Sequence, residues 1–398
     1  MAEGIWADLI GQDAAIETLE HAVRDAEKLE RGEPGPAMTH AWLITGPPGS
    51  GRSSAATRFA AALTCPENGC GVCMVCRAVP KGGHPDVHVH VPEGGQILVE
   101  DAHELIRLAA QSPTEGPWRI MVIEDADRLN ATSANALLKS LEEPTPHTVW
   151  ILCAPSVEDV LPTISSRTRH VNLRTPSTAD IASLLTAVYG IDPSLAALSA
   201  RASQGHIGRA RALATDAEAR NRRQRDMRAP FELRDLARCF AVAADISESA
   251  TAIAHERADA LDAVESQLLK DRYYAEGVSK LEKGLRRSYE AELKALTTAH
   301  KRRRKRLVRD EVDRSLIDLA GLYRDVLVIQ LEGDVELINE ELRPGVEKLA
   351  AAGDAADTAR RLSAIEHARK QLAADVLPTL VLESLMVELK DPKVRAAS

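Results

Sequence analysis

Residues 40–53 read His40-Ala-Trp-Leu-Ile-Thr-Gly-Pro-Pro-Gly-Ser-Gly-Arg-Ser53, and this stretch decides the fold. It follows the phosphate-binding pattern G-x-x-x-x-G-K-[ST]. In that pattern glycines let backbone N–H groups surround the phosphates, the lysine reaches the β- and γ-phosphates and the hydroxyl holds Mg²⁺. An apolar run precedes the glycines at 42–45, and a helix-forming run follows at 53–63. A strand, a loop and a helix in this order predict an α/β P-loop core.

The loop departs from the pattern at one position, because Arg52 stands where the lysine is expected. A planar guanidinium on a longer stem does not simply replace a compact ammonium. The other positions keep the loop intact, so ATP or ADP with Mg²⁺ stays a candidate ligand, whereas turnover is expected to be weak or absent. The predicted nucleotide-binding residues of the loop are Gly46, Pro47, Pro48, Gly49, Ser50, Gly51, Arg52, Ser53 and Ser54.

A second apolar run, at 118–123, ends in the acids Glu124 and Asp125. In a nucleotide-hydrolysing fold, one carboxylate at this place assists the metal and the next polarises the attacking water. The usual order is Asp then Glu, and here it is reversed. The reversal moves each carboxylate by about 1.5 Å, and misplacement on that scale costs on the order of a hundredfold in rate. The pair is therefore predicted to be a degenerate Walker B motif; if the segment stood alone, an ordinary strand followed by a solvated acidic turn would be the preferable interpretation.

Length and composition limit the number of domains and the class of protein. A chain of 398 residues is expected to form two or three domains. The net charge of −9 is no global nucleic-acid signature. The sequence contains no apolar run near the roughly 18–20 residues that span a bilayer, and residues 1–8 lack the pattern of a signal peptide. We therefore expect a soluble cytoplasmic protein.

The cysteines are concentrated in one short stretch. Four of the six lie between residues 65 and 76, at Cys65, Cys70, Cys73 and Cys76. Two overlapping C-x-x-C steps and a nearby fourth thiol match the way tetrahedral Zn²⁺ collects thiolates. Disulfides or four unrelated thiols are the alternatives, and an intracellular chain disfavours disulfides. Four thiolates leave no open coordination position, so a structural zinc site is predicted. The remaining cysteines, Cys153 and Cys239, are expected to be small core residues.

Further segments follow these motifs in a recognisable order. Residues 135–144 read Asn-Ala-Leu-Leu-Lys-Ser-Leu-Glu-Glu-Pro, 149–156 form the next strand-like run, and 161–167 end in Ser166-Arg167. Together with the P-loop, the cysteine insert and the acids, this order resembles the clamp-loader branch of the AAA+ proteins. It is most similar to the delta-prime family of bacterial DNA polymerase III subunits. The resemblance covers about residues 1–215, including Gly11-Gln12, and is weak beyond.

The resemblance implies roles for individual side chains. Arg167, in Ser166-Arg167-Thr168 where the family has Ser-Arg-Cys, is implied to be an arginine finger that acts in trans on the nucleotide of a neighbouring subunit. Ser156 occupies about the place of the residue that senses the γ-phosphate. Arg209 is the candidate sensor arginine of the lid; Arg211 competes for this role, and a plain surface cation is the alternative.

Three domains are predicted. Residues 1–175 form the AAA+ nucleotide-binding core with the four-cysteine zinc module at 65–76, residues 176–225 form a small helical lid, and residues 226–398 form an all-α collar. No proline occurs between Pro230 and Pro344, so long helices are expected there. The resemblance implies that the collar holds a hetero-pentamer with gamma/tau and delta subunits, which act on a sliding clamp and primed DNA. The apolar stripe at 312–326 is explained equally well by packing within the chain.

Two functions from different classes fit these motifs. The first is a stator-like delta-prime subunit that helps to load the clamp and supplies Arg167 to a neighbouring ATPase. The second is a catalytically active ATPase of the gamma/tau type. Arg52 and the reversed acids favour the first, since two parts of the hydrolysis machinery are altered together. A zinc-dependent nucleic-acid-binding protein leaves the ordered motifs unexplained. The basic run 301–306 is open to DNA, an acidic partner or solvent.

Overall fold

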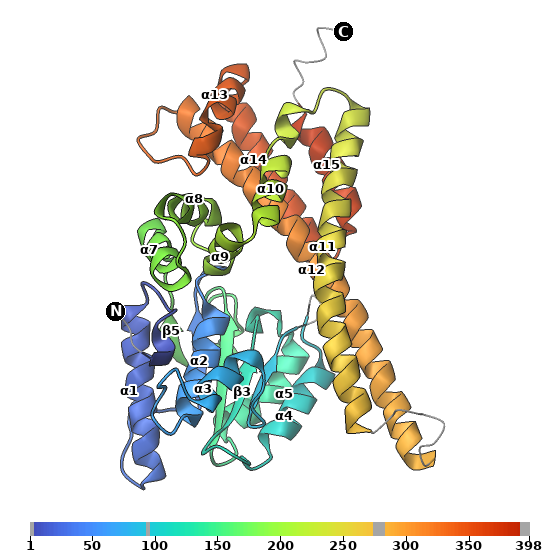
Figure 1. Ribbon diagram of the computed structural model, residues 1–398. Coiled ribbons are helices and arrows are strands. Elements are labelled where there is room, and N and C mark those ends of the chain that lie inside the picture. Colours follow the sequence, from blue (N-terminus) through green and yellow to red (C-terminus); the bar gives the residue numbers. More distant parts are fainter. Residues whose placement is uncertain (1–3, 93–95, 274–282, 391–398) are drawn as a thin grey trace. The chain divides into compact units, whose positions relative to one another are not determined.

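The protein is described by a computed structural model over residues 4–92, 96–273 and 283–390, which fall into two compact units (Figure 1). The first unit holds the residues up to Pro92 and Gln96–Ala217, and the second holds the residues from Glu218 onward. The predicted domain boundaries at 175/176 and 225/226 stay predictions. Residues 274–282 and 391–398 of the predicted collar, and residues 1–3 and 93–95 of the predicted core, lie outside the described residues.

A parallel five-stranded sheet with the order β2-β3-β4-β1-β5 forms the centre of the first unit. Its strands are β1 (Ala41–Thr45), β2 (Val87–His90), β3 (Arg119–Ile123), β4 (Thr148–Ala154) and β5 (Arg169–Asn172). The three strands predicted from apolar runs, β1, β3 and β4, are buried along their whole length. Thr45 lies opposite Ala154 and Ile123 opposite Leu152, so the loops that follow these strands meet at one edge of the sheet.

Helices cover both faces of this sheet. They are η1 (Gly4–Trp6), α1 (Asp13–Glu30), α2 (Arg52–Thr64), α3 (Met74–Ala78), η2 (Val79–Lys81), α4 (Val99–Ala109), η3 (Ala126–Arg128), α5 (Ala131–Glu142) and α6 (Pro162–Ser165). Alternate strand residues divide between two apolar clusters. Trp42 and Ile44 pack with η1, α1 and α2, whereas Leu43 and Trp150 pack with α4 and α5. The P-loop helix α2 is therefore fixed on one face of the sheet.

Three short helices complete the first unit. They are α7 (Thr178–Tyr189), α8 (Pro193–Ser203) and α9 (Ile207–Thr215), and they share a small apolar cluster of their own. Ser177 is the N-cap of α7: its hydroxyl accepts the Asp180 N–H at 3.1 Å. The predicted small helical lid is thus present.

The second unit is helical. The chain enters it along α10 (Ala217–Asp226) and continues through η4 (Ala229–Phe231), α11 (Leu236–Arg272), α12 (Lys283–Gln330), η6 (Glu340–Leu342), α13 (Arg343–Ala352), α14 (Ala355–Ala373) and α15 (Pro378–Leu389). Helices α11 and α12 have 37 and 48 residues, as the absence of proline predicted. The apolar stripe of α12 at 312–326 is buried against other helices of the same unit. The predicted architecture, an α/β P-loop core with a helical lid and an all-α C-terminal region, is confirmed.

Two further predictions concern the cysteines outside the module and membrane-spanning helices. Cys153 and Cys239 are 2% and 0% exposed, so the interpretation of both as core residues is confirmed. None of the helices in the described ranges has the combination of length and hydrophobicity that a membrane-spanning helix needs.

Candidate functional site

The P-loop connects the buried strand β1 to the first turn of α2. Gly51, at φ 95°, is the N-cap of that helix, and Gly49, at φ 88°, has the same left-handed backbone that favours glycine. A Cβ on Gly49 would lie 2.5 Å from Cγ of His206, so no larger side chain fits there. The N–H groups of the first turn of α2 and the helix dipole make this loop a place for an anion.

Other loop residues form a tight turn and the start of α2. The Ser50 N–H donates to the Pro47 carbonyl at 3.1 Å and closes the turn, while Pro48 is exposed. Ser53 and Ser54 lie exposed in the first turn of α2. Two buried polar atoms, Ser50 Oγ and Arg52 Nη1, have no hydrogen-bond partner in the described part of the chain. A phosphate group would supply acceptors for both, so the loop fits a nucleotide phosphate.

Arg52 turns towards the acids that follow β3. Its side chain is 14% exposed, and its Nη2 lies 3.9 Å from Oδ1 of Asp125. Asp125 also pairs with Arg128, at 3.3 Å. The second acid of the reversed motif is therefore neutralised by two arginines, one of which stands in the place of the P-loop lysine. Each oxygen of Asp125 thus faces a cation, Oδ1 that of Arg52 and Oδ2 that of Arg128.

The acids themselves leave the strand in a sharp turn. The Glu124 N–H still extends the sheet by donating to the His90 carbonyl at 2.9 Å, and Asp125 then adopts a left-handed conformation at φ 48°. Asp127 lies beside them, and one of its oxygens is buried without a partner among the described residues. Burial, followed by the charge of Asp125, raises the pKa of Asp127. The sequence reasoning missed Asp127, although it lies only two residues after Asp125.

The lid contacts the P-loop through the start of α9. The Ile207 N–H points at the Gly49 carbonyl, 3.4 Å away, and His206 packs against Gly49. His206 also caps α9 by accepting the Arg209 N–H at 3.2 Å, which places the half-buried Arg209 in the first turn after this contact. His206 was not predicted from the sequence; no spacing rule links it to a glycine in the P-loop.

Ser156, the predicted γ-phosphate sensor, lies just after β4 at the same edge of the sheet. Its hydroxyl donates to Asp159 at 2.9 Å and accepts the Asp159 N–H at 3.3 Å. These contacts hold Ser156 in a local turn. The sensor role of Ser156 stays a prediction.

Arg167 lies between α6 and β5, and its side chain is 35% exposed. Its Nε donates to Oε1 of Glu142 at 2.5 Å, and its Nη1 donates to the Thr163 carbonyl at 2.9 Å. Glu142, the last residue of α5, thus orients the guanidinium. The sequence reasoning missed this partner because 25 residues separate the two side chains. Both partners belong to α5 and α6, so the contacts that orient Arg167 lie outside the P-loop.

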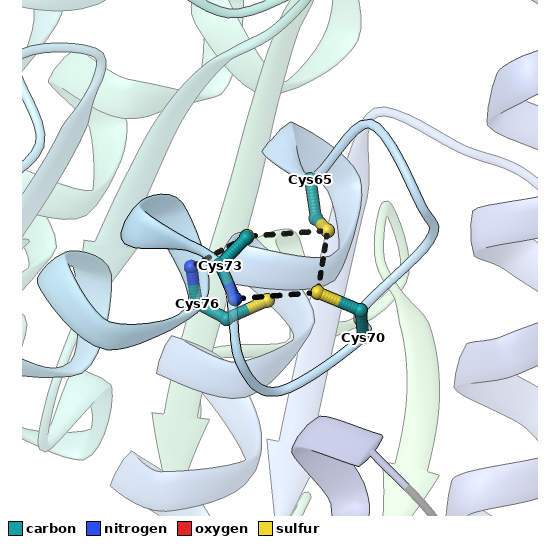
Figure 2. Close-up of side chains that lie close together, drawn as sticks. All are labelled: Cys65, Cys70, Cys73 and Cys76. Atoms are coloured by element: carbon teal, nitrogen blue, oxygen red, sulfur yellow. Dashed lines mark hydrogen bonds between the residues drawn. The ribbon is translucent and has the colours of Figure 1, made fainter.

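The four cysteines of residues 65–76, the cysteine module, converge on one point (Figure 2). All four sulfurs lie within 4.8 Å of one another, and Cys65 Sγ is 3.9 Å from Cys70 Sγ and 3.7 Å from Cys73 Sγ. Zn–S bonds of about 2.3 Å in a tetrahedron place sulfurs about 3.8 Å apart. The cluster therefore has the donor set and the spacing of a zinc site.

Backbone amides prepare the thiols of this module for a metal. The Cys73 N–H donates to Cys70 Sγ and the Cys76 N–H to Cys73 Sγ, each at 3.4 Å. Burial opposes ionisation of Cys65, but N–H donors outweigh it and lower its pKa to about 7, whereas burial raises the pKa of Cys76. Gly69, at φ 98°, allows the turn between Cys65 and Cys70. The module also docks on η1, since the Ile5 N–H donates to the Gly69 carbonyl at 2.9 Å.

Known proteins share the segment that carries these motifs. Residues 25–177 match the family described as DNA polymerase III, delta subunit. The delta' subunit of DNA polymerase III from Pseudomonas aeruginosa is 38% identical over 134 residues, which are 32% of this chain and 41% of that protein. Over part of its length, the chain is therefore similar to subunits of DNA polymerase III.

Other relatives carry a different subunit name. The gamma/tau subunit of DNA polymerase III from Mycobacterium bovis is 33% identical over 175 residues, which are 42% of this chain and 28% of that protein. The matched stretches thus span less than half of each of these relatives. A solved structure of a gamma subunit-related protein from Thermotoga maritima superposes over 94% of this chain and 98% of that one, with a TM-score of 0.40 and 17% identity.

Proposed function

We propose that this chain acts as a delta-prime subunit of a DNA polymerase III clamp loader and hydrolyses little or no ATP itself. In this role it contributes to a hetero-pentamer with gamma/tau and delta subunits, which places the sliding clamp on primed DNA. Its contribution to catalysis is Arg167, presented to the nucleotide of a neighbouring ATPase subunit. A rigid delocalised cation is suited to stabilising charge on a transferring γ-phosphate.

The contrast between two arginines carries this proposal. Arg52 is enclosed and directed at Asp125, so the chain's own P-loop pairs its cation with an acid of the hydrolysis motif. Arg167 keeps its guanidinium at the surface, where Glu142 and the Thr163 carbonyl hold it in one orientation. Such an arrangement supports weak turnover in the chain's own pocket and action on a pocket in another subunit.

We further propose that the cysteine module holds one structural Zn²⁺ through Cys65, Cys70, Cys73 and Cys76. The metal would tie the end of α2 to α3 and to η1, because the module contacts each of them. Four thiolates leave no position for substrate, so its role is structural.

A reconstituted loader tests the arginine finger. We expect Arg167→Ala to leave assembly intact, by size-exclusion chromatography, and to slow DNA-stimulated ATP hydrolysis at the affected site on the order of 10³-fold. Arg107→Ala is the matched control, because Arg107 is also an exposed arginine paired with a glutamate, at 2.6 Å, and lies on α4. A loader that keeps its full rate with Arg167→Ala contradicts the proposal.

An ATPase of the gamma/tau type is the second candidate, favoured by the identity to the mycobacterial gamma/tau subunit and by the intact Gly46, Gly51 and Ser53. The two candidates differ in the isolated chain. Steady ATP hydrolysis by the purified protein, abolished by Ser53→Ala, supports the gamma/tau type. Negligible hydrolysis that Ser53→Ala does not change supports the delta-prime type.

A further inference from the structure

The basic run predicted at 301–306 divides between two faces of α12. Arg303 and Arg304 point to α11: Arg303 donates to Glu265 at 2.7 Å, and Arg304 pairs with Asp262 at 2.9 Å. His300 joins the same cluster through Glu265, at 2.9 Å. These cations hold the two long helices together, so their charges are already paired within the protein. Lys301 and Lys305, in contrast, are exposed.

Lys301 and Lys305 belong to a longer row that the sequence run did not reveal. Arg287, Lys294, Lys301 and Lys305 are all exposed and follow one another on α12 at spacings of seven, seven and four residues. Such spacings place side chains on one face of a helix. We name these four residues the basic row. Tyr289 and Leu307, which are buried, lie two residues after Arg287 and Lys305, about 200° further round the helix. The row therefore points away from the buried side of α12.

The four charges of the basic row have no acidic partner among the residues that the structure describes. The two acids nearest in sequence are already paired: Glu290 with Arg286 at 2.9 Å, and Glu292 with Arg272 at 3.1 Å. The side chains between the cations are small, and a shallow hollow on this face is lined by Ala291, Lys294, Ala295, Thr298, Ala299 and Arg302. A polyanion can therefore come close to the helix surface along the whole row.

We propose that the basic row binds the phosphate backbone of double-stranded nucleic acid without reading its sequence. The row is about 27 Å long at 1.5 Å per residue, which matches about eight base pairs of duplex at 3.4 Å per pair. A protein partner would call for large apolar anchors between the charges, and a single strand would call for aromatic side chains on which bases stack. Ala291, Ala295 and Thr298 supply neither.

Binding of the full-length chain to a fluorescein-labelled duplex of mixed sequence, about 20 base pairs long, tests this inference. The test variant is Arg287→Gln/Lys294→Gln/Lys301→Gln/Lys305→Gln. The matched control, Arg24→Gln/Arg77→Gln/Lys81→Gln/Lys348→Gln, removes the same charge from four other exposed positions. Anisotropy is measured between low and moderate salt, because each phosphate contact contributes about 0.9 to the slope of log affinity against log salt.

We expect the test variant to lose at least tenfold in affinity and about 3.6 units of that slope, with the control close to wild type. Equal losses in both variants overturn the proposal, since net charge alone then explains binding. Tighter binding to a single strand with the same number of phosphates, or full competition by polyglutamate at equal charge, also overturns it, the latter in favour of an acidic protein partner. The assay involves no ATP and no other subunit, so its failure is separate from failure of the proposed function.

Discussion

The cysteine module and a cluster around Asp325 both connect segments of the protein through polar groups. They differ in how far apart in the sequence these groups lie. The cysteine module takes all four thiols from residues 65–76. Asp325, on α12, is fully buried; it accepts the N–H groups of Ile338 at 3.0 Å and of Asn339 at 2.7 Å. Arg223 on α10 joins this cluster through Asn339 and through Asp318, at 2.9 Å.

The difference concerns distance along the chain. Arg223 and Asn339 are separated by 116 residues, whereas neighbouring cysteines of the module are at most five apart. A short-range cluster leaves a spacing pattern in the sequence, and a long-range one leaves only isolated polar residues. We therefore expect damage to the cysteine module to stay in the first unit and damage at Asp325 to stay in the second. All four tryptophans, at 6, 42, 118 and 150, lie in the first unit, so tryptophan fluorescence reports on it alone.

The largest effect is expected from Cys76→Ser. The change removes a buried ligand, and we expect zinc content to fall from about one per chain to almost none. Zinc-finger peptides gain about 10–16 kcal/mol from the metal; because the first unit also has an apolar core beyond the module, a smaller loss, on the order of 5 kcal/mol, is expected. Metal analysis and urea unfolding by tryptophan fluorescence measure both. Cys153→Ala, buried but outside the module, should keep the zinc; a metal-free wild type with four reactive thiols would contradict the site.

Asp325→Ala comes next. It leaves the buried N–H groups of Ile338 and Asn339 without an acceptor, so we expect a loss of about 3 kcal/mol in the second unit. Far-UV circular dichroism in urea should show an earlier helical transition, while the tryptophan transition stays in place. Asp334→Ala, at an exposed position before the same loop residues, is the control. Equal shifts in both signals would mean that the two units unfold together, and the comparison would break down.

A pH titration gives an intermediate effect in the first unit. Asp86 is buried and accepts the N–H groups of Thr114, Glu115 and Gly116 at 2.7–2.9 Å. Burial opposes its ionisation, but these donors outweigh it and lower its pKa from 3.8 to about 2. The stabilisation is present above pH 4 and is lost as the pH falls towards 2, by about 2 kcal/mol. Asp86→Asn should flatten this part of the tryptophan-detected stability curve; an unchanged slope would assign the acid sensitivity to other groups.

The smallest effect is expected from Arg52→Lys. The change restores the usual P-loop residue but leaves the reversed Glu124-Asp125 order, so ATP hydrolysis by the isolated chain should stay negligible. A coupled phosphate-release assay measures it, with Arg52→Lys/Glu124→Asp/Asp125→Glu as the companion variant. Hydrolysis restored by the single change would show that the acids are competent as they stand.

Local patterns explain which features were predictable. The P-loop and the cysteine module each lie within a short stretch of chain, so the geometry of a single turn or helix start is reflected in residue order. Glu142 beside Arg167, His206 against Gly49 and the partners of Asp325 were not predictable, because each pair is brought together by packing. The basic run shows both cases: its composition was visible, but the division into cations paired with α11 and the exposed basic row depends on which side of α12 meets a neighbour.

Residue order alone was sufficient to predict the parallel α/β core, the altered P-loop, the cysteine site and the long proline-free helices, since glycine conformations, thiol spacing and apolar periodicity act over short distances. Tertiary structure alone decided where Arg52 and Arg167 point, which carboxylates neutralise or hold them, and which cations of α12 remain at the surface. The physical reason is that an ion pair or a buried carboxylate depends on how far apart two groups lie in space, and folding sets that separation only after distant elements have packed.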